Sequence, residues 1–303
     1  MLYSVVDDKG DIVKAPVNLV PCQCQCGESP IWDAAARRLS WIDTENPVCT
    51  TLEPSTGRIE KTTTPWLVQA IGRRVSGGWV AVVRDGFALL DASPASGRIL
   101  GNPGEGIAHM TMNDGAVGPD GRFYAGSLNV DVLDAPDGCL YRVDADGSIA
   151  AIETGLVLPN GISFSPDGKT MYVTEMWVNR ITAFDFDARA GTVSHRRALI
   201  QVPEEEGHPD GLIVDEQGFL WSGHWQGFRV TRYDPDGKKV THIDVPVPTA
   251  TCMAFGGPDL DQLFITTGKK GLSPEQVQKY PEAGDLFMVP AGVRGRIEPA
   301  FGG

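Results

Sequence analysis

The feature that most constrains the fold of this chain is a short turn-and-strand unit that recurs along its length. Each copy is a small polar turn, usually built on Asp and Gly, followed by a run that ends in aromatic or β-branched residues. The copies are PIWDAAARRLSWID, RRVSGGWVAVV, VGPDGRFYAGS, FSPDGKTMYVTE, VDEQGFLWSGH and FGGPDLDQLFITTG, at 30–43, 73–83, 117–127, 164–175, 214–224 and 255–268. Successive turns lie about 40 to 50 residues apart, which is typical of propeller blades.

A second unit alternates with the first and also occurs six times. It consists of a strand-like run, a turn that contains Asp or Gly, and another strand-like run, as in GCLYRVDADGSI and FRVTRYDPDGKKV. Two hairpins per repeat give four antiparallel strands per blade, so the sequence predicts an all-β, six-bladed β-propeller around a central channel. The repeat has no break, and we therefore expect 1–303 to form one domain. The last copy lies near the C-terminus, so residues 1 to about 20 should supply the outer strand of the final blade.

The composition of the chain argues against several classes of function. Hydrophobic residues make up 42% of the chain and charged residues 21%, enough for a sizeable core, and the formal net charge is -13. An acidic surface repels phosphate backbones, which argues against nucleic acid as a partner.

No run of about 18 apolar residues occurs, so we expect no membrane segment. The N-terminus lacks the pattern of a signal peptide. We therefore expect a cytoplasmic protein without disulfides, which is a monomer or a weak homodimer.

Polar residues recur at one position of the repeat. Eight residues before the turn glycine or its counterpart, four repeats carry a carboxylate or an amide, namely Glu28, Asn113, Asn160 and Asp210. The sixth repeat has Thr251 there, and the second has only apolar Ala70 or Ile71. In a propeller these positions begin the innermost strands, so the side chains converge at one mouth of the channel. Such oxygen donors suit a hard or borderline divalent cation. Each Asn-Gly or Asp-Gly alone is also a turn dipeptide, but the recurrence in register favours a shared metal site.

The loops that follow the returning strands should rim the same mouth. They are residues 129–137, 175–179 and 224–228. Trp177 and Trp225 would form walls of a substrate pocket there, or else pack between blades. We interpret His208 and His224 as rim or structural residues, because nothing in the sequence places either of them near the metal.

Three cysteines alternate in CQCQCGESPIWD, residues 22–33. Neighbouring cysteines on one extended strand are poorly placed for a disulfide, and the other three make no C-x₂-C pair for zinc. Alternate residues of a strand share one face, and Cys behaves as a small buried hydrophobe, so we predict packing. The same alternation, continued by one more step, places Glu28 on the face that carries the three cysteines.

Several segments together resemble one known family. CGESPIW, MNDGAVGPDGRFYAGS, NGISFSPDGKTMYVTE and PDGLIVDEQGFLW are similar to segments of the SMP-30/gluconolactonase/regucalcin family, six-bladed propellers that hydrolyse sugar lactones with one divalent metal. The resemblance implies Glu28, Asn160 and Asp210 as metal ligands. It implies Ca²⁺ first, with Zn²⁺, Mg²⁺, Mn²⁺ and Fe²⁺ as alternatives. Asn113 would face the metal-bound substrate or water, and Asp114 would support the turn beside it.

The remaining expectations concern the substrate. Asp131 stands where animal members carry a substrate-binding Glu, and Thr111, in HMTMNDG, stands where family lactonases often have Arg. The residues expected to bind substrate are therefore Asn113, Asp131, Thr111 and Trp177. Loss of the cation at Thr111 indicates a less polar lactone, or a sugar lactone that binds differently.

The sequence thus predicts metal-assisted hydrolysis of a lactone, a small-molecule partner. The cation would polarise the ring carbonyl and lower the pKa of a bound water. Asp210 is either the general base or only a ligand, and Asn113 would orient the substrate. No G-x-S-x-G elbow supports a serine nucleophile. Two alternatives remain open: a phosphotriesterase-like metal hydrolase, and a non-catalytic calcium-binding regulatory protein.

Overall fold

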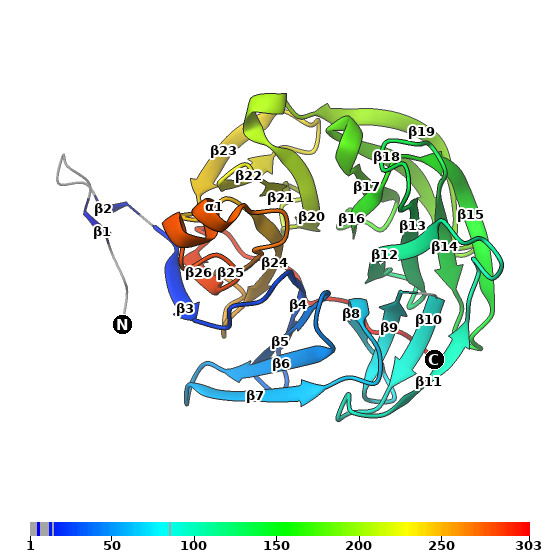
Figure 1. Ribbon diagram of the computed structural model, residues 1–303. Helices are drawn as coiled ribbons and strands as arrows, with labels where there is room; N and C mark the ends of the chain where they lie inside the picture. The colour runs from blue at the N-terminus through cyan, green and yellow to red at the C-terminus, as the bar shows by residue number, and fades with distance from the viewer. Residues whose placement is uncertain (1–4, 7–11, 14, 85) are drawn as a thin grey trace.

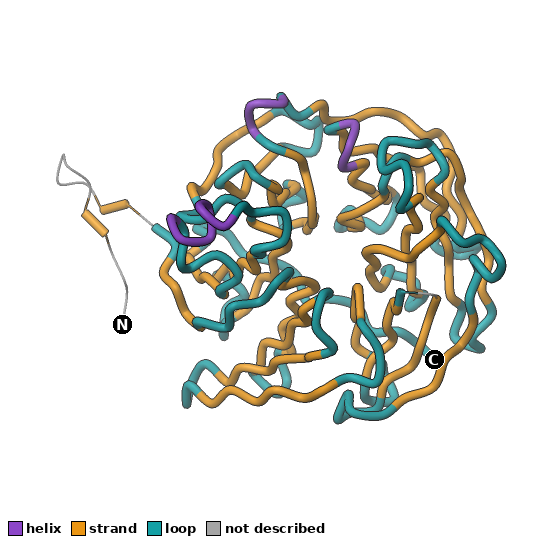
Figure 2. The backbone as a smooth tube through the Cα atoms, viewed as in Figure 1, coloured by secondary structure: helices purple, strands orange, loops and turns teal. Residues whose placement is uncertain are grey.

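Six four-stranded antiparallel sheets stand around a central channel in the computed structural model, as Figure 1 shows. The structure describes residues 5–6, 12–13, 15–84 and 86–303. Strands make up most of the tube in Figure 2, with turns at both ends of each blade. The prediction of a six-bladed propeller with four strands per blade is confirmed.

The first three blades follow one another along the chain. The first contains β4 (Gly27–Asp33), β5 (Arg38–Asp43), β6 (Val48–Glu53) and β7 (Arg58–Thr63); the second contains β8 (Val68–Arg73), β9 (Trp79–Val83), β10 (Gly86–Leu90) and β11 (Gly97–Gly101); the third contains β12 (Met110–Val117), β13 (Phe123–Asn129), β14 (Gly138–Val143) and β15 (Ile149–Leu156). In each blade the chain runs from the channel outward.

The remaining blades complete the ring. The fourth contains β16 (Pro159–Phe164), β17 (Thr170–Glu175), β18 (Arg180–Asp187) and β19 (Thr192–Gln201); the fifth contains β20 (His208–Val214), β21 (Leu220–Trp225), β22 (Arg229–Tyr233) and β23 (Lys239–Asp244); the sixth contains β24 (Ala250–Gly256), β25 (Gln262–Thr267), β26 (Leu286–Pro290) and β3 (Val17–Val20). Two short 3-10 helices, η1 (Met176–Val178) and η2 (Glu204–Glu206), and one helix, α1 (Pro274–Lys279), lie in the loops. No helix among the described residues is both long and apolar enough to cross a membrane.

The N-terminal segment closes the ring as predicted, but through a short strand. β3 pairs antiparallel with β26, with Val20 opposite Leu286 and Asn18 opposite Phe287. The expectation that residues 1 to about 20 form this strand is therefore too broad. β1 (Val5–Val6) and β2 (Ile12–Val13) pair with each other in a separate sheet, and 1–4, 7–11 and 14 lie outside the described residues.

The hydrophobic core lies between neighbouring blades. The inner strand β24 is buried along its whole length, whereas the outer strands β7 and β23 are largely exposed. Aromatic residues fill the wedges between blades; Trp32 of the first blade stacks on Phe264 of the sixth with ring centroids 5.8 Å apart. An apolar face on both sides of each inner strand is what a blade needs to pack against two neighbours.

The cysteine segment packs as predicted, but it is not a strand. Residues 21–25 lie outside any strand, Gln23 has φ 58°, and Cys26 forms only an isolated bridge with Gly268. Cys24 is buried in the core cluster that contains Trp41, and Cys22 packs against that cluster. The expectation of packing is confirmed, and that of one shared strand face is wrong, because the left-handed conformation of Gln23 interrupts the extended backbone. All six cysteines are free.

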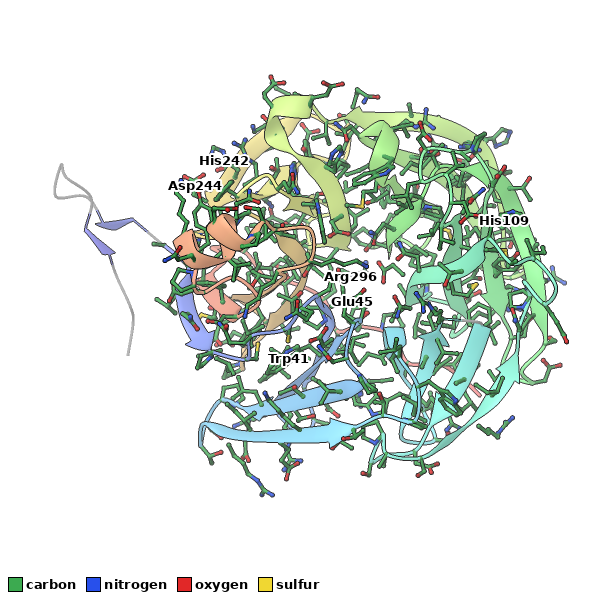
Figure 3. All side chains as sticks on the ribbon, in the orientation of Figure 1. Trp41, Glu45, His109, His242, Asp244 and Arg296 are labelled. Carbon is green, nitrogen blue, oxygen red and sulfur yellow. The ribbon has the colours of Figure 1, made fainter. Side chains whose placement is uncertain are left out.

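The C-terminal segment covers the end of the channel away from the predicted site. Arg296 donates from Nη1 to the carbonyl of Phe164 at 3.1 Å, and Phe301 forms a bridge with Arg74. Residues 296–299 line the cavity at that end together with residues of the inner strands. Figure 3 shows Arg296 close to the centre of the ring. The other end of the channel is the one that carries the predicted site.

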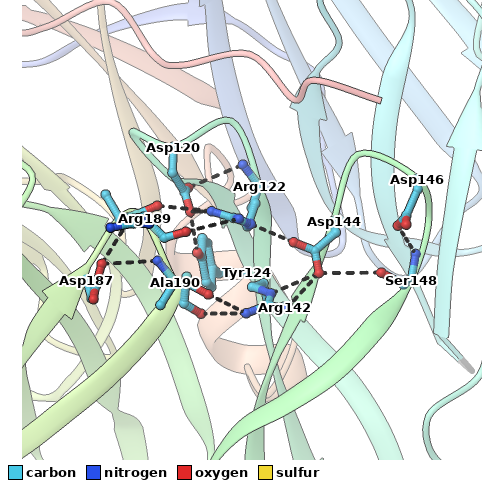
Figure 4. Close-up of polar contacts among 12 residues, drawn as sticks. Asp120, Arg122, Tyr124, Arg142, Asp144, Asp146, Ser148, Asp187, Arg189 and Ala190 are labelled. Carbon is cyan, nitrogen blue, oxygen red and sulfur yellow. Dashed lines mark hydrogen bonds and ion pairs between the residues drawn. The ribbon is translucent and has the colours of Figure 1, made fainter.

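Charged side chains in the turns join the third blade to the fourth, as Figure 4 shows. Arg122 donates from Nη1 to Asp120 at 2.8 Å and from Nε to Asp144 at 2.5 Å. It also donates to the carbonyl of Ala188 at 3.0 Å, in the turn between β18 and β19. Tyr124 donates its hydroxyl to Asp120 at 2.7 Å. One guanidinium therefore connects three turns.

We expect Arg122→Ala to lower the free energy of unfolding by about 2–3 kcal/mol, because it leaves the buried carboxylate of Asp120 without its cation. Urea denaturation measures this. Arg58→Ala is the matched control. Arg58 is exposed on β7, and within the described residues its side chain pairs only with Glu60, so its removal should cost less than about 0.5 kcal/mol. Equal losses for the two variants would contradict the role of Arg122 in joining blades.

Candidate functional site

A break in strand register occurs at the same place in all six innermost strands. The regular pairing shifts between Glu28 and Ile31 in β4, and between Asn160 and Ile162 in β16. Corresponding shifts lie in β8, β12, β20 and β24. Such bulges bend a strand and redirect side chains, and they are common beside active sites. The Asn-Gly and Asp-Gly pairs thus lie inside strands, so their interpretation as turn dipeptides is wrong.

The glycines after Asn160 and Asp210 let neighbouring inner strands approach closely. A Cβ atom on Gly161 would lie 2.4 Å from the carbonyl oxygen of Asp210 and 2.7 Å from Cβ of Leu212. A Cβ on Gly211 would lie 2.7 Å from the carbonyl oxygen of Thr251. Any side chain at these positions would push adjacent blades apart. The residue before each glycine is therefore held close to the corresponding residue of the next blade.

This approach brings the predicted ligands together. Glu28, Asn160 and Asp210 come from the first, fourth and fifth blades and are 8%, 8% and 2% exposed. The amide Nδ2 of Asn160 lies 2.5 Å from Oδ1 of Asp210. Asn113, on β12, donates from Nδ2 to the carbonyl of Pro159 at 3.0 Å, and its neighbour Asp114 faces the same space.

The corresponding residue of the sixth blade does not take part. Thr251 donates its hydroxyl to the carbonyl of Gly27, on the first blade, at 2.5 Å and also bonds Thr266 of its own blade, so its side chain is used in packing between the blades. It does not line the cavity at the mouth of the channel.

The carboxylates of the site carry charge that the protein does not balance. Burial raises the pKa of Glu28 and that of Asp210 well above their ordinary values, and mutual repulsion, including that from Asp114, adds to the effect. Burial raises the pKa of Asp114 to about 7. None of the three forms an ion pair within the described part of the chain. Lys270 lowers the first two pKa values only weakly, and its Nζ binds Glu45 at 2.6 Å.

A divalent cation fits this arrangement. Two buried carboxylates and an amide offer oxygen donors, and a cation would neutralise the charge that burial makes costly. In the described ranges, no three His, Cys, Asp or Glu side chains lie close enough to hold an ion by themselves. The amide oxygen of Asn160 and water would therefore be needed to complete the set. The amide oxygen of Asn160 accepts the backbone N–H of Gly161 at 2.9 Å, and its second lone pair is left for a cation.

A cavity opens above the three ligands at the mouth of the channel, with a volume of about 290 Å³. Its walls are largely apolar, formed by Leu67, Leu128, Val130, Leu133, Leu158, Met176, Trp177 and Trp225. Thr111 and Asn113 also line it, and Thr111 donates its hydroxyl to the carbonyl of Arg84 at 2.8 Å. The structure thus brings together all the predicted site residues except Asp131. That residue is exposed in the loop after β13, outside the lining of the cavity.

The histidines have structural surroundings. His208 packs on Trp177 with ring centroids 4.5 Å apart and pairs through Nδ1 with Asn179 at 2.6 Å. His224 is fully buried, its Nδ1 lies 2.8 Å from the carbonyl of Glu206, and burial lowers its pKa to about 4. Neither lines the cavity, which agrees with their interpretation as rim or structural residues.

Three charged residues of the cavity were missed by the sequence reasoning. Glu45, Arg84 and Lys270 follow β5, β9 and β25, the returning strands of the first, second and sixth blades. Figure 3 shows Glu45 beside the centre of the ring. The rule that loops after returning strands rim the mouth would have found all three, had it been applied to every blade.

Comparison with known proteins identifies similar chains. Residues 26–269 match the model of the "SMP-30/Gluconolactonase/LRE-like region". Regucalcin of Oryctolagus cuniculus is 32% identical over 91% of this chain and 95% of its own length. Pentonolactonase XacC of Haloferax volcanii is 32% identical over 92% of this chain and 96% of its own. The crystal structure of a calcium-binding protein, regucalcin, from Agrobacterium tumefaciens aligns with a TM-score of 0.88 at 27% identity, over 95% of this chain and 97% of that one.

The packing at Gly161 is testable. We expect Gly161→Ala to lower the free energy of unfolding by about 1–3 kcal/mol, because the new Cβ separates the fourth and fifth blades. Binding of added Ca²⁺, measured by calorimetry, should weaken at the same time. The control is Gly302→Ala, whose Cβ would lie 3.7 Å from its nearest neighbours. Unchanged Ca²⁺ binding in the Gly161 variant would show that close approach of the blades is not what assembles the site.

No cation of the described chain pairs with the buried carboxylates of the site. We therefore expect the free energy of unfolding to have an unusual dependence on pH. The pKa values of these carboxylates are higher in the folded than in the unfolded chain, so the folded state binds more protons between the two values. The free energy of unfolding of the metal-free protein should therefore fall as pH rises above about 4, the ordinary pKa of a carboxyl group. We expect Asp210→Asn to reduce this fall and to stabilise the metal-free protein at pH 8 by about 1–2 kcal/mol.

Urea denaturation at several pH values in a chelator measures the effect, and Glu60→Gln on the exposed surface serves as the control. Added Ca²⁺ should stabilise the wild type at pH 8 more than it stabilises the Asp210 variant. A pH profile that is identical for the wild type and Asp210→Asn would contradict the charge imbalance.

Proposed function

The chain belongs to the SMP-30/gluconolactonase/LRE-like family, and we propose that it hydrolyses a sugar lactone to the hydroxy acid with the help of one divalent cation. The family and its relatives, a pentonolactonase among them, support sugar lactone hydrolysis in general. The cation and the mechanism are our proposal. Ca²⁺ is our first candidate for the ion, since the donors are hard oxygens.

The observation that carries the proposal is the unbalanced charge at the base of an open cavity. Glu28, Asn160 and Asp210 come from three blades, they are buried, and no cation of the described chain pairs with either carboxylate. A purely structural ion site would be closed over by protein. Here the apolar walls, with Trp177 and Trp225, leave room for a small ring above the ligands.

In the proposed hydrolysis, several residues of the chain have separate roles. A bound cation would polarise the lactone carbonyl and make a water molecule more acidic. Asp210 provides a carboxylate that can accept the proton of the attacking water, and its position is maintained by the amide of Asn160. Asn113 donates to the carbonyl of Pro159, which leaves its amide oxygen to orient a substrate hydroxyl. The apolar walls exclude bulk water and strengthen these polar contacts.

The test is proton release from a panel of aldonolactones and simple aliphatic and aromatic lactones. Activity should disappear in a chelator and return with one of Ca²⁺, Mg²⁺, Mn²⁺, Zn²⁺ or Fe²⁺. We expect Asp210→Ala to lower kcat/KM at least 100-fold, since it removes both a ligand and the proposed base. Asp244→Ala, on the exposed outer strand of the same blade, should change it less than twofold.

Each contrary outcome has a definite meaning. Turnover that survives complete chelation, or that is unchanged in Asp210→Ala, would contradict the mechanism. Tight binding of Ca²⁺ without turnover of any lactone would favour a non-catalytic calcium-binding protein. Hydrolysis of a phosphotriester in preference to every lactone would favour a phosphotriesterase.

A further inference from the structure

A second cavity adjoins the active-site cavity at its rim. This side cavity has a volume of about 280 Å³ and is formed by Arg84 directly after β9, the start of β12 and the loop between β11 and β12. Its lining residues are Arg84, Asn102, Gly104, Gly106, Ile107, Ala108, Met110, Thr111 and Met112. Three of them, Arg84, Thr111 and Met112, line the active-site cavity as well. A ligand longer than one ring can therefore extend past Thr111 from one cavity into the other.

Arg84 is held at the junction of the two cavities by its backbone. Its carbonyl accepts the hydroxyl of Thr111 at 2.8 Å and the backbone N–H of Met112 at 3.0 Å. These bonds attach the turn of the second blade to β12, which also carries Asn113. The guanidinium itself is exposed and makes no ion pair or hydrogen bond with any residue of the described ranges. Arg84 therefore presents its guanidinium beside the opening from a fixed backbone position.

The two cavities differ in charge. Glu28, Asp114 and Asp210 lie at the base of the active-site cavity, and Lys270, which lines it together with Arg84, is engaged by Glu45. In the lining of the side cavity, as far as the structure describes it, Arg84 is the only charged residue. Asn102 adds an amide, whose oxygen accepts the N–H of Gly104 at 2.8 Å and whose N–H groups remain for a ligand. An anionic group is therefore repelled at the base and attracted at the side cavity.

We infer that Arg84 binds a carboxylate of the substrate, and that the substrates are lactones with a carboxylate at the end remote from the ring carbonyl. The inference rests on the proposed lactone hydrolysis. A guanidinium matches a carboxylate with two parallel hydrogen bonds. A dianionic phosphate fits less well, because its second charge would meet the acidic base of the adjoining cavity. Hydrolysis adds one water across the ring ester, and the product is a hydroxy dicarboxylic acid.

Two lactones with the same ring make the test. D-Glucaro-1,4-lactone carries a terminal carboxylate where D-glucono-1,4-lactone has a hydroxymethyl group. We expect kcat/KM of the wild type to favour the former about tenfold or more. Arg84→Gln should lower kcat/KM about tenfold for the carboxylate substrate and less than twofold for the neutral one, and Arg84→Lys should retain part of the preference. Arg98→Gln, on the exposed outer strand of the same blade, is the matched control.

A binding experiment separates this inference from the proposed function. Calorimetry in Ca²⁺ compares D-glucarate with D-gluconate, and we expect the wild type, but not Arg84→Gln, to bind the dicarboxylate about tenfold more tightly. That result without turnover of either lactone would support the role of Arg84 and contradict lactone hydrolysis. Equal kcat/KM values for the two lactones, a preference that Arg84→Gln leaves intact, or no difference in binding between the two acids would overturn the assignment of Arg84.

Discussion

The site depends on how closely the innermost strands approach one another. At Gly161 and Gly211 the backbone of the next blade occupies the space that a side chain would need. The bulges beside these glycines turn the preceding residues toward the axis. Because the fourth, fifth and sixth blades approach one another in this way, residues far apart in sequence come within bonding distance, as Asn160 and Asp210 do. The same contact that packs the blades therefore assembles the site.

Two groups of buried carboxylates differ in whether a cation pairs with them. In the turns and between the outer strands, buried carboxylates are paired: Asp215 accepts from Arg232 and Trp221, and Glu175 accepts from Arg180 and Arg196. In the described part of the chain, Glu28, Asp114 and Asp210 at the mouth of the channel have no cationic partner. The mutual repulsion of these three carboxylates costs stability. Such local costs are typical of functional sites.

Much of this could be read from the sequence because a propeller repeats. The turn spacing predicted six blades, and the recurrence of polar residues in register led to Glu28, Asn160 and Asp210, which the structure brings together. Register alone does not say what a side chain bonds: Thr251 occupies the corresponding position of the sixth blade, and its hydroxyl donates to the carbonyl of Gly27 on the first blade.

What the sequence reasoning missed depends on loop geometry and on tertiary contacts. Loops follow no period, so the position of Asp131 outside the cavity could not be derived from spacing. The left-handed backbone of Gln23 breaks a segment whose alternation looked like a strand.

The pairing of β3 with β26 has a consequence for the order of folding. The first five blades consist of consecutive hairpins, which can form as soon as their own residues are available. The sixth cannot be completed until a segment from near the end of the chain returns to one from near the beginning. That blade stands between the fifth and the first, the blades that carry Asp210 and Glu28. A growing chain therefore contains Glu28 and Asp210 before the ring is closed. The site can bind a ligand only after β3 has paired with β26.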